Sequence, residues 1–150
     1  EMYEMIVGLL GGRVAEELFL EDISTGASND IERASKLARD MVGKYGMCQN
    51  LGTVSYLSGD ELFIGRDFEK TKSYSEKVAA AMDDEVKNLI DKAYAQCREI
   101  LRKDADKMEK IVAFLLENEV MSGPQFTDCM ENKEIRESTN TSIFDAYENE

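Results

Sequence analysis

The chain has 150 residues, a length typical of one domain, and 43% of its residues are hydrophobic, which is enough to build a packed core. Its formal net charge of −13, from 31 acidic and 18 basic residues, repels phosphate backbones and anionic membranes, so we expect no nucleic-acid partner. No stretch reaches the roughly 20 apolar residues that a membrane span needs, and we therefore expect a soluble chain.

Histidine is absent from the chain, and its three cysteines, Cys48, Cys97 and Cys129, lie far apart. Neither a Cys/His zinc site nor a Ser-His-Asp or Cys-His nucleophile can be assembled without an imidazole. A Ser–Lys dyad stays open, although no spacing favours one. Reduced, packed thiols in a cytosol-like compartment are the expected state of the cysteines.

The first predicted element is an amphipathic helix over residues 2–18. Its apolar residues recur at steps of three and four: Met2, Met5, Ile6, Leu9, Leu10, Val14 and Leu18. Gly11 and Gly12 interrupt this pattern, and each costs about 1 kcal/mol relative to alanine within a helix. The glycine pair therefore predicts a kink or a close contact with another backbone.

Two adjacent glutamates, Glu16 and Glu17, stand near the end of this helix. They point about 100° apart, so at most one of them faces any given site. The plain interpretation is a solvated surface, with Arg13 as the intrahelical ion-pair partner of one glutamate.

A second helix is predicted over residues 29–45, with Gly46 as its C-terminal stop. Its apolar face consists of Ile31, Ala34, Leu37, Ala38, Met41, Val42 and Tyr45. Asn29 is the expected N-cap, with Asp30 as the first helical residue and Glu32 as the third. Both carboxylates then complement the positive end of the helix, at about 0.3–1 kcal/mol each, which by itself explains an aspartate at this position.

A β-hairpin or two short strands are predicted around residues 52–65, because the strings LGTVSYL and ELFIGRDF mix β-branched and aromatic residues. The second string holds one glycine and one arginine, too little for a phosphate-binding loop.

Three further helices are predicted in the second half of the chain. The first runs for roughly 28 residues from its N-cap Ser75, and the second covers residues 104–118 with Asp104 as its N-cap. The inward face expected of the second helix is Met108, Ile111, Val112, Leu115 and Leu116. The third covers residues 123–131 and has Pro124 in its first turn.

The predicted fold is thus mainly α, with the domain over residues 1–131 and a flexible acidic tail over residues 132–150.

Five strings carry a resemblance to a known family, in this order along the chain: LLGGRVAEELF, ISTGASNDIERASKLARDMVGKYGM, LGTVSY, FIGRDF and YSEKVAAAMDDEVKNLIDKAYAQCREIL. Together they resemble the C-terminal part of the peptidase domain of the FtsH-type ATP-dependent zinc metalloproteases, peptidase family M41. The resemblance covers residues 5–126, and the first two strings are its most specific part.

The resemblance implies a mostly helical endopeptidase domain that degrades membrane and cytosolic proteins. In this family the domain works as a homo-hexamer beneath an AAA+ ATPase ring that uses ATP and magnesium. N-terminal segments anchor the full-length protein in a membrane, with the peptidase domain on the cytoplasmic side or on the matrix or stroma side of an organelle.

The family's zinc ion is held by two histidines of an HExxH helix and by one later aspartate, which corresponds to Asp30. The HExxH glutamate is the general base, and water takes the fourth position on the zinc. By the same resemblance Glu16 lies near the metal site, and the segment Thr53, Val54, Ser55 and Tyr56 lies near the cleft, where an extended substrate can pair with it.

The chain departs from the family pattern at one decisive point, because the HExxH motif would lie upstream of Glu1. We therefore expect no catalytic residue, no bound zinc and no peptidase activity in this chain alone. It corresponds to an excised fragment or a truncated paralogue that lacks the ATPase module and the membrane anchors. The alternative is a non-catalytic helical interaction module derived from the same fold.

Overall fold

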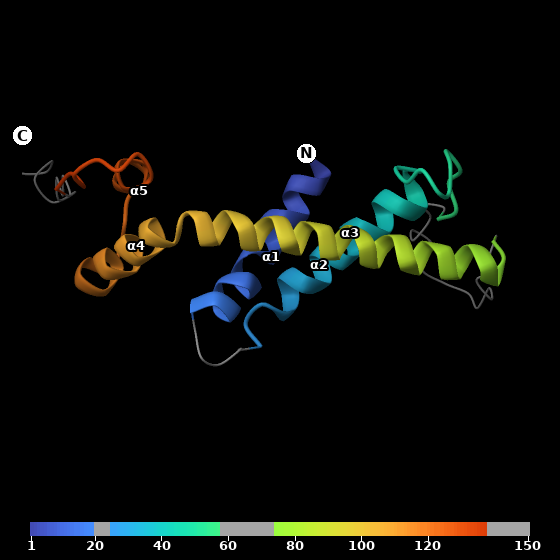
Figure 1. The fold of residues 1–150 in the computed structure, drawn as a ribbon, viewed down its shortest axis with the longest axis horizontal. Helices are drawn as coiled ribbons and strands as arrows, with labels where there is room; N and C mark the ends of the chain where they lie inside the picture. Colours follow the sequence, from blue (N-terminus) through green and yellow to red (C-terminus); the bar gives the residue numbers. More distant parts are fainter. Residues whose placement is uncertain (20–24, 58–73, 138–150) are drawn as a thin grey trace, which may run out of the picture. The chain divides into compact units, whose positions relative to one another are not determined.

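The computed structural model describes residues 1–19, 25–57 and 74–137 (Figure 1). Nearly all regular structure in these ranges is helical, so the prediction of a mainly α fold is confirmed. The elements are α1 (Met2–Phe19), α2 (Ser28–Arg39), the π-helical turn η1 (Asp40–Lys44), α3 (Glu76–Lys103), α4 (Ala105–Asn118) and α5 (Gly123–Met130).

The chain divides into two compact units, residues 1–102 and residues 103–150. The first unit holds α1, α2, η1 and nearly all of α3, and the second holds α4 and α5. The division predicted from the sequence, after residue 131, stays a prediction.

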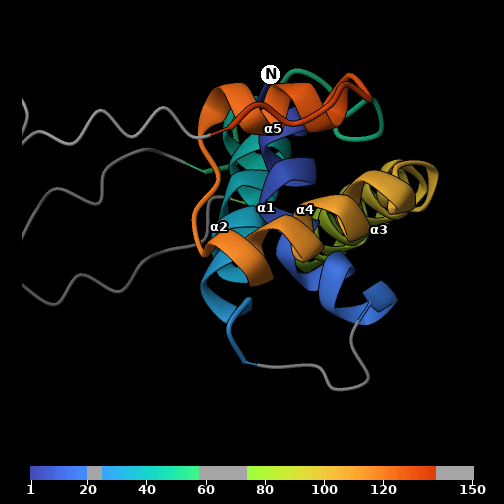
Figure 2. The same cartoon turned by 90° about the vertical axis from the view of Figure 1, so that its left-hand side faces the viewer.

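The core of the first unit lies where α1, α2 and α3 meet (Figure 1; Figure 2). Its buried members are Ile6, Leu10 and Val14 of α1, Ala34 and Ala38 of α2, Met41 of η1, and Ala93 and Cys97 of α3. The members from α1 and α2 follow the spacing of four residues that puts side chains on one helix face. Alanines at the contact positions of α2 allow its backbone to approach α1 closely, and α1 and α2 form the most extensive helix pair in the described residues.

Helix α1 runs through Gly11 and Gly12 without interruption. A Cβ atom added to either glycine would meet no atom within 4 Å, the backbone of its own helix aside. The predicted close contact with another backbone is therefore wrong, whereas the kink stays a prediction.

Helix α2 begins two residues earlier than predicted, with Ala27 rather than Asn29 at the N-cap position and no side-chain cap. Asp30 is therefore the third helical residue, not the first. The turn is closed by the backbone instead, because the N–H of Ile31 donates to the carbonyl of Ala27 at 3.0 Å. Ala27 itself is buried.

The turn η1 ends α2 and leaves a backbone acceptor free for the segment that follows. The N–H of Tyr45 donates to the carbonyl of Asp40 at 3.0 Å, the wider spacing of a π-helix. The carbonyl of Gly43 then accepts from the N–H groups of Tyr56 (2.7 Å) and Leu57 (3.0 Å). Gly46 has φ +59° and follows Tyr45, the C-cap of η1, which confirms Gly46 as the stop.

No strand forms in residues 52–57; they contain only one end of an isolated antiparallel bridge between Cys48 and Gly52. The prediction of a strand here is wrong because the N–H groups of Tyr56 and Leu57 bond to Gly43 and not to a partner strand. The rest of the predicted hairpin, residues 58–65, lies outside the described residues.

Helix α3 begins at Glu76, directly after its predicted cap. Ser75 Oγ accepts a hydrogen bond of 3.2 Å from the N–H of Val78, which confirms Ser75 as the N-cap. Near this end of α3, Met82 packs with Val42 and Leu51 in a second, smaller buried cluster. This cluster holds the segment after η1 against α3.

Helix α4 begins directly after Asp104, as predicted, although the Asp104 side chain makes no capping hydrogen bond and pairs instead with Lys107 at 2.9 Å. None of its residues is buried. The prediction that Val112, Leu115 and Leu116 point inward is wrong, and Leu116 is 81% exposed. The reason is size, since α5, the described element that packs on α4 within this unit, has only eight residues.

Helix α5 has Pro124 in its first turn, as predicted. Its N-terminus is closed by a capping box between Ser122 and Gln125, which was not predicted from the sequence.

Candidate functional site

Asp30 lies in the first turn of α2 with its side chain 43% exposed. The carboxylate oxygen Oδ1 is 3.7 Å from Nη1 of Arg33, one turn further along the helix. This is a loose ion pair in solvent and leaves the carboxylate accessible. The helix that carries Asp30 is fixed on α1 by two fully buried alanines, Ala34 and Ala38, so the position of Asp30 is set by core packing.

A zinc site needs three or four protein ligands close together. Among the described residues no group of three or more histidine, cysteine, aspartate or glutamate side chains has this arrangement. The described residues therefore do not make a zinc site by themselves, and Asp30 could supply one carboxylate to a site whose other ligands come from elsewhere.

The adjacent glutamates Glu16 and Glu17 of α1 have different surroundings. Glu17 Oε1 accepts a hydrogen bond of 2.9 Å from Nη1 of Arg98, so Glu17 ties α1 to α3. The expected intrahelical pair with Arg13 is therefore not needed to explain Glu17. Glu16 is half-buried on the same helix and also has an interaction partner. Because α1 packs on α2, Glu16 and Asp30 lie on neighbouring helices.

The segment Thr53–Tyr56 has one anchored end and one exposed end. Thr53, Val54 and Ser55 are exposed, and Val54 makes no backbone hydrogen bond to any described residue. Tyr56 is anchored, because its hydroxyl donates to the Leu51 carbonyl at 3.2 Å and its ring packs edge-on against Tyr74. The exposed residues Thr53 to Ser55 are accessible to another chain, and the contacts of Tyr56 fix the position of the segment.

An open pocket of about 220 Å³ lies between α1 and α2. Its lining residues are Met5, Leu9, Arg33, Lys36, Leu37 and Asp40. No sequence pattern predicts this pocket, although Met5 and Leu9, four residues apart, lie on one predicted helix face. Met5 is exposed because this end of the face is not covered by any described residue.

The cysteines are free thiols, and two of them have shifted pKa values. Burial raises the pKa of Cys97. The pKa of Cys48 is raised too, mainly by partial burial and to a smaller extent by a hydrogen bond to Glu85. The same hydrogen bond, together with one from Asn50, lowers the pKa of the Glu85 carboxyl. Both thiols are therefore protonated near neutral pH and are weak nucleophiles and weak metal ligands.

No helix within the described ranges is both long enough and apolar enough to cross a membrane.

The comparison with known proteins identifies the family. The profile of peptidase family M41 matches residues 1–129. The ATP-dependent zinc metalloprotease FtsH of Caldicellulosiruptor bescii is 50% identical over 127 residues, which are 84% of this chain and 21% of that protein. FtsH 1 of a Thermoanaerobacter species is 46% identical over 136 residues, 90% of this chain and 22% of that protein. FtsH of Bacillus subtilis is 38% identical over 139 residues, 91% of this chain and 22% of that protein.

The chain thus spans about a fifth of the length of the curated relatives it matches. The family profile covers most of the chain, and the matched region includes α1, α2 and Asp30. The chain belongs to peptidase family M41.

Proposed function

We propose that this chain is the C-terminal part of the proteolytic domain of an ATP-dependent zinc metalloendopeptidase that degrades membrane and cytosolic proteins. The observation that carries the proposal is the family match over residues 1–129, together with relatives named as ATP-dependent zinc metalloproteases at 38–50% identity. The helical architecture and the exposed carboxylate of Asp30 are compatible with this role.

Asp30 is the residue of this chain proposed to bind the zinc ion. Its support is the accessible carboxylate on a helix that is fixed by core packing. The imidazole ligands come from outside the chain, because the chain has no histidine, and the general base is the glutamate of the same HExxH motif. Zinc polarises a scissile carbonyl and lowers the pKa of its bound water, so a peptidase needs this carboxylate as a ligand and not as a base.

Two further assignments rest on the same proposal. Glu16, on the helix that packs against α2, is proposed to act near the metal site by orienting groups that bind it. The segment Thr53–Tyr56 is proposed to contact an extended substrate, and its exposed backbone at Val54 supports this assignment.

The wider setting of the full-length protein is proposed from the family. It is a homo-hexamer coupled to an AAA+ ATPase that uses ATP and magnesium. N-terminal segments anchor it in a membrane, and its peptidase domain faces the cytoplasm, the matrix or the stroma. This chain alone is proposed to bind no zinc and to cleave no peptide.

The test compares Asp30→Asn with Glu32→Gln in the longer protein that carries this chain. Both variants remove one negative charge from the start of α2, but only the first removes the proposed ligand. We expect Asp30→Asn to lower zinc content and peptidase activity by at least about tenfold, and Glu32→Gln to leave both near wild type. Normal zinc content in the Asp30→Asn variant would show that Asp30 is not a zinc ligand.

The alternative is a non-catalytic helical interaction module, and the exposed apolar side chains of α4 are the observation that favours it. The reading frame upstream of the codon for Glu1 separates the two proposals. An HExxH motif there supports the protease, and a start codon without one supports the interaction module.

A further inference from the structure

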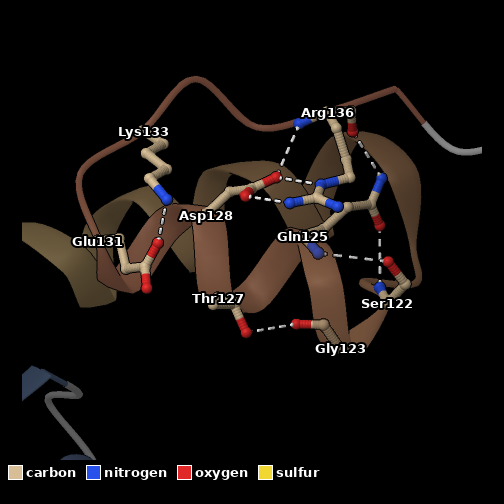
Figure 3. Close-up of polar contacts among 8 residues, drawn as sticks. All are labelled: Ser122, Gly123, Gln125, Thr127, Asp128, Glu131, Lys133 and Arg136. Carbon is tan, nitrogen blue, oxygen red and sulfur yellow. Dashed lines mark hydrogen bonds and ion pairs between the residues drawn. The ribbon is translucent and has the colours of Figure 1, made fainter.

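The second unit contains a polar network that no part of the proposed protease function uses (Figure 3). Its first half is the capping box of α5. Ser122 Oγ accepts from the N–H of Gln125 at 3.4 Å, and the N–H of Ser122 donates to Oε1 of Gln125 at 2.9 Å. Gln125 is buried, although glutamine is usually an exposed residue, so its amide must be satisfied within the network.

The second half of the network is the segment 131–136, which turns back along α5. Asn132 has φ +55°, and the N–H of Lys133 donates to the backbone carbonyl of Asp128 at 2.8 Å. The left-handed residue reverses the chain, and the hydrogen bond at Lys133 keeps the reversed segment beside the helix that it has just left.

Arg136 closes this segment onto α5 (Figure 3). Its Nε and Nη2 atoms donate to the two carboxylate oxygens of Asp128 at 2.5 and 2.6 Å, and its N–H donates to the same carboxylate at 3.3 Å. Its carbonyl accepts from Nε2 of Gln125 at 3.1 Å. Both the side chain and the backbone of one residue are thus held by two residues of α5.

The two partners of the ion pair are buried to very different extents. The Asp128 side chain is 5% exposed, whereas the Arg136 side chain is 60% exposed. The side-chain hydrogen bonds from Arg136 lower the pKa of the Asp128 carboxyl to about 2. Loss of Arg136 would leave a buried carboxylate without its counter-ion, which is costly, while the exposed arginine would tolerate the loss of Asp128 better.

We propose that Asp128, Gln125 and Arg136 form a clasp that makes residues 122–136 one cooperative unit, with Arg136 as the residue that locks it. The lock is a single bidentate pair at the end of the segment, so α5 and the returning segment open and close together. Chain beyond residue 137 is then dispensable for α5, whereas Arg136 is required.

The first experiment is amide hydrogen exchange on the full chain, with Arg136→Gln compared with Lys110→Gln. Both variants remove one positive charge from the same unit, and Lys110 lies exposed on α4, outside the clasp. We expect the Lys133 amide to exchange about ten- to a hundredfold faster in Arg136→Gln and at the wild-type rate in Lys110→Gln. Amides of α2 report on the other unit and should stay unchanged in both variants.

The second experiment places a stop codon after residue 137 or after residue 135. The longer variant keeps Arg136 and should protect the Lys133 amide as the full chain does, and the shorter variant should lose this protection. Equal protection in the two truncated chains, or an unchanged Lys133 exchange rate in Arg136→Gln, would overturn the clasp.

Discussion

The two units of the chain use the same kind of amphipathic helix with opposite results. In the first unit most of the apolar residues of α1 and α2 pack against each other and against α3, and Ile6 and Val14 have no exposed surface. In the second unit α4 also has an apolar face, yet none of its residues is buried. The comparison shows that a stripe of apolar residues predicts a helix reliably but does not predict whether the stripe is covered.

The second unit compensates in part through polar contacts. Among its described residues the buried ones are Gln125, Asp128 and Cys129, and the hydrogen bonds of the clasp satisfy the polar groups of the first two. The first unit depends on packing of methyl groups, which is non-directional, and the second depends on paired groups with defined geometry.

The largest expected effect comes from truncating one apolar side chain in each unit. Ile6→Ala creates a cavity in a closed core and should lower the free energy of unfolding by about 2–5 kcal/mol. Leu116→Ala removes a side chain that is 81% exposed and should change it by less than about 0.5 kcal/mol. Urea unfolding followed by circular dichroism measures both, and similar losses in the two variants would contradict the comparison.

The next effect concerns two glycines of the first unit. A Cβ at Gly43 would lie 2.7 and 2.8 Å from Cδ1 and Cγ of Leu57, so Gly43→Ala forces Leu57 to move and should cost about 1–3 kcal/mol. Gly12→Ala adds its Cβ in open space on an uninterrupted helix and should stabilise the chain by about 0.5–1 kcal/mol.

Opposite signs are therefore expected from the same chemical change, measured by thermal unfolding of the two variants. A destabilised Gly12→Ala chain would mean that α1 does need a glycine there. An unchanged Gly43→Ala chain would mean that Leu57 is not fixed against η1.

The sequence predicted those features that depend on local chemistry. Ser75 as a cap, Gly46 as a stop and Pro124 in a first turn all act within a few residues, and the structure confirms each of them. The start of α2 was misplaced because Ala27 caps the helix without a side-chain hydrogen bond, and burial of a methyl group leaves no local signal.

Features that depend on chain reversal or on neighbouring elements were not predicted. Asp128 and Arg136 meet only because the chain reverses at Asn132, and no periodic pattern in the sequence predicts that reversal. The capping box of α5 could have been predicted from the sequence, because Ser122 and Gln125, three residues apart, match its pattern. Asp30 could be assigned to a metal only through the family resemblance, since its local geometry is that of an ordinary first-turn aspartate.

The smallest expected effect is the dependence of the second unit on acid. The pKa of Asp128 is about 2 in the folded chain and 3.8 as an unperturbed carboxyl, so the folded state binds the proton less readily. The stabilisation by Asp128 is therefore fully present above pH 3.8 and is lost as the pH falls towards 2, because the unfolded chain is protonated first.

Exchange of the Lys133 amide, measured as a function of pH after correction for the intrinsic rate, tests this expectation locally. Protection of that amide in the wild-type chain should fall between pH 3.8 and about 2, relative to an Asp128→Asn chain whose protection lacks this step. Other carboxylates titrate in both chains, so the difference between the two curves isolates Asp128. A flat difference across this interval would show that the ion pair with Arg136 does not stabilise the charged form of Asp128. The second unit would then not depend on this ion pair for its stability, and the contrast with the apolar packing of the first unit would be weaker.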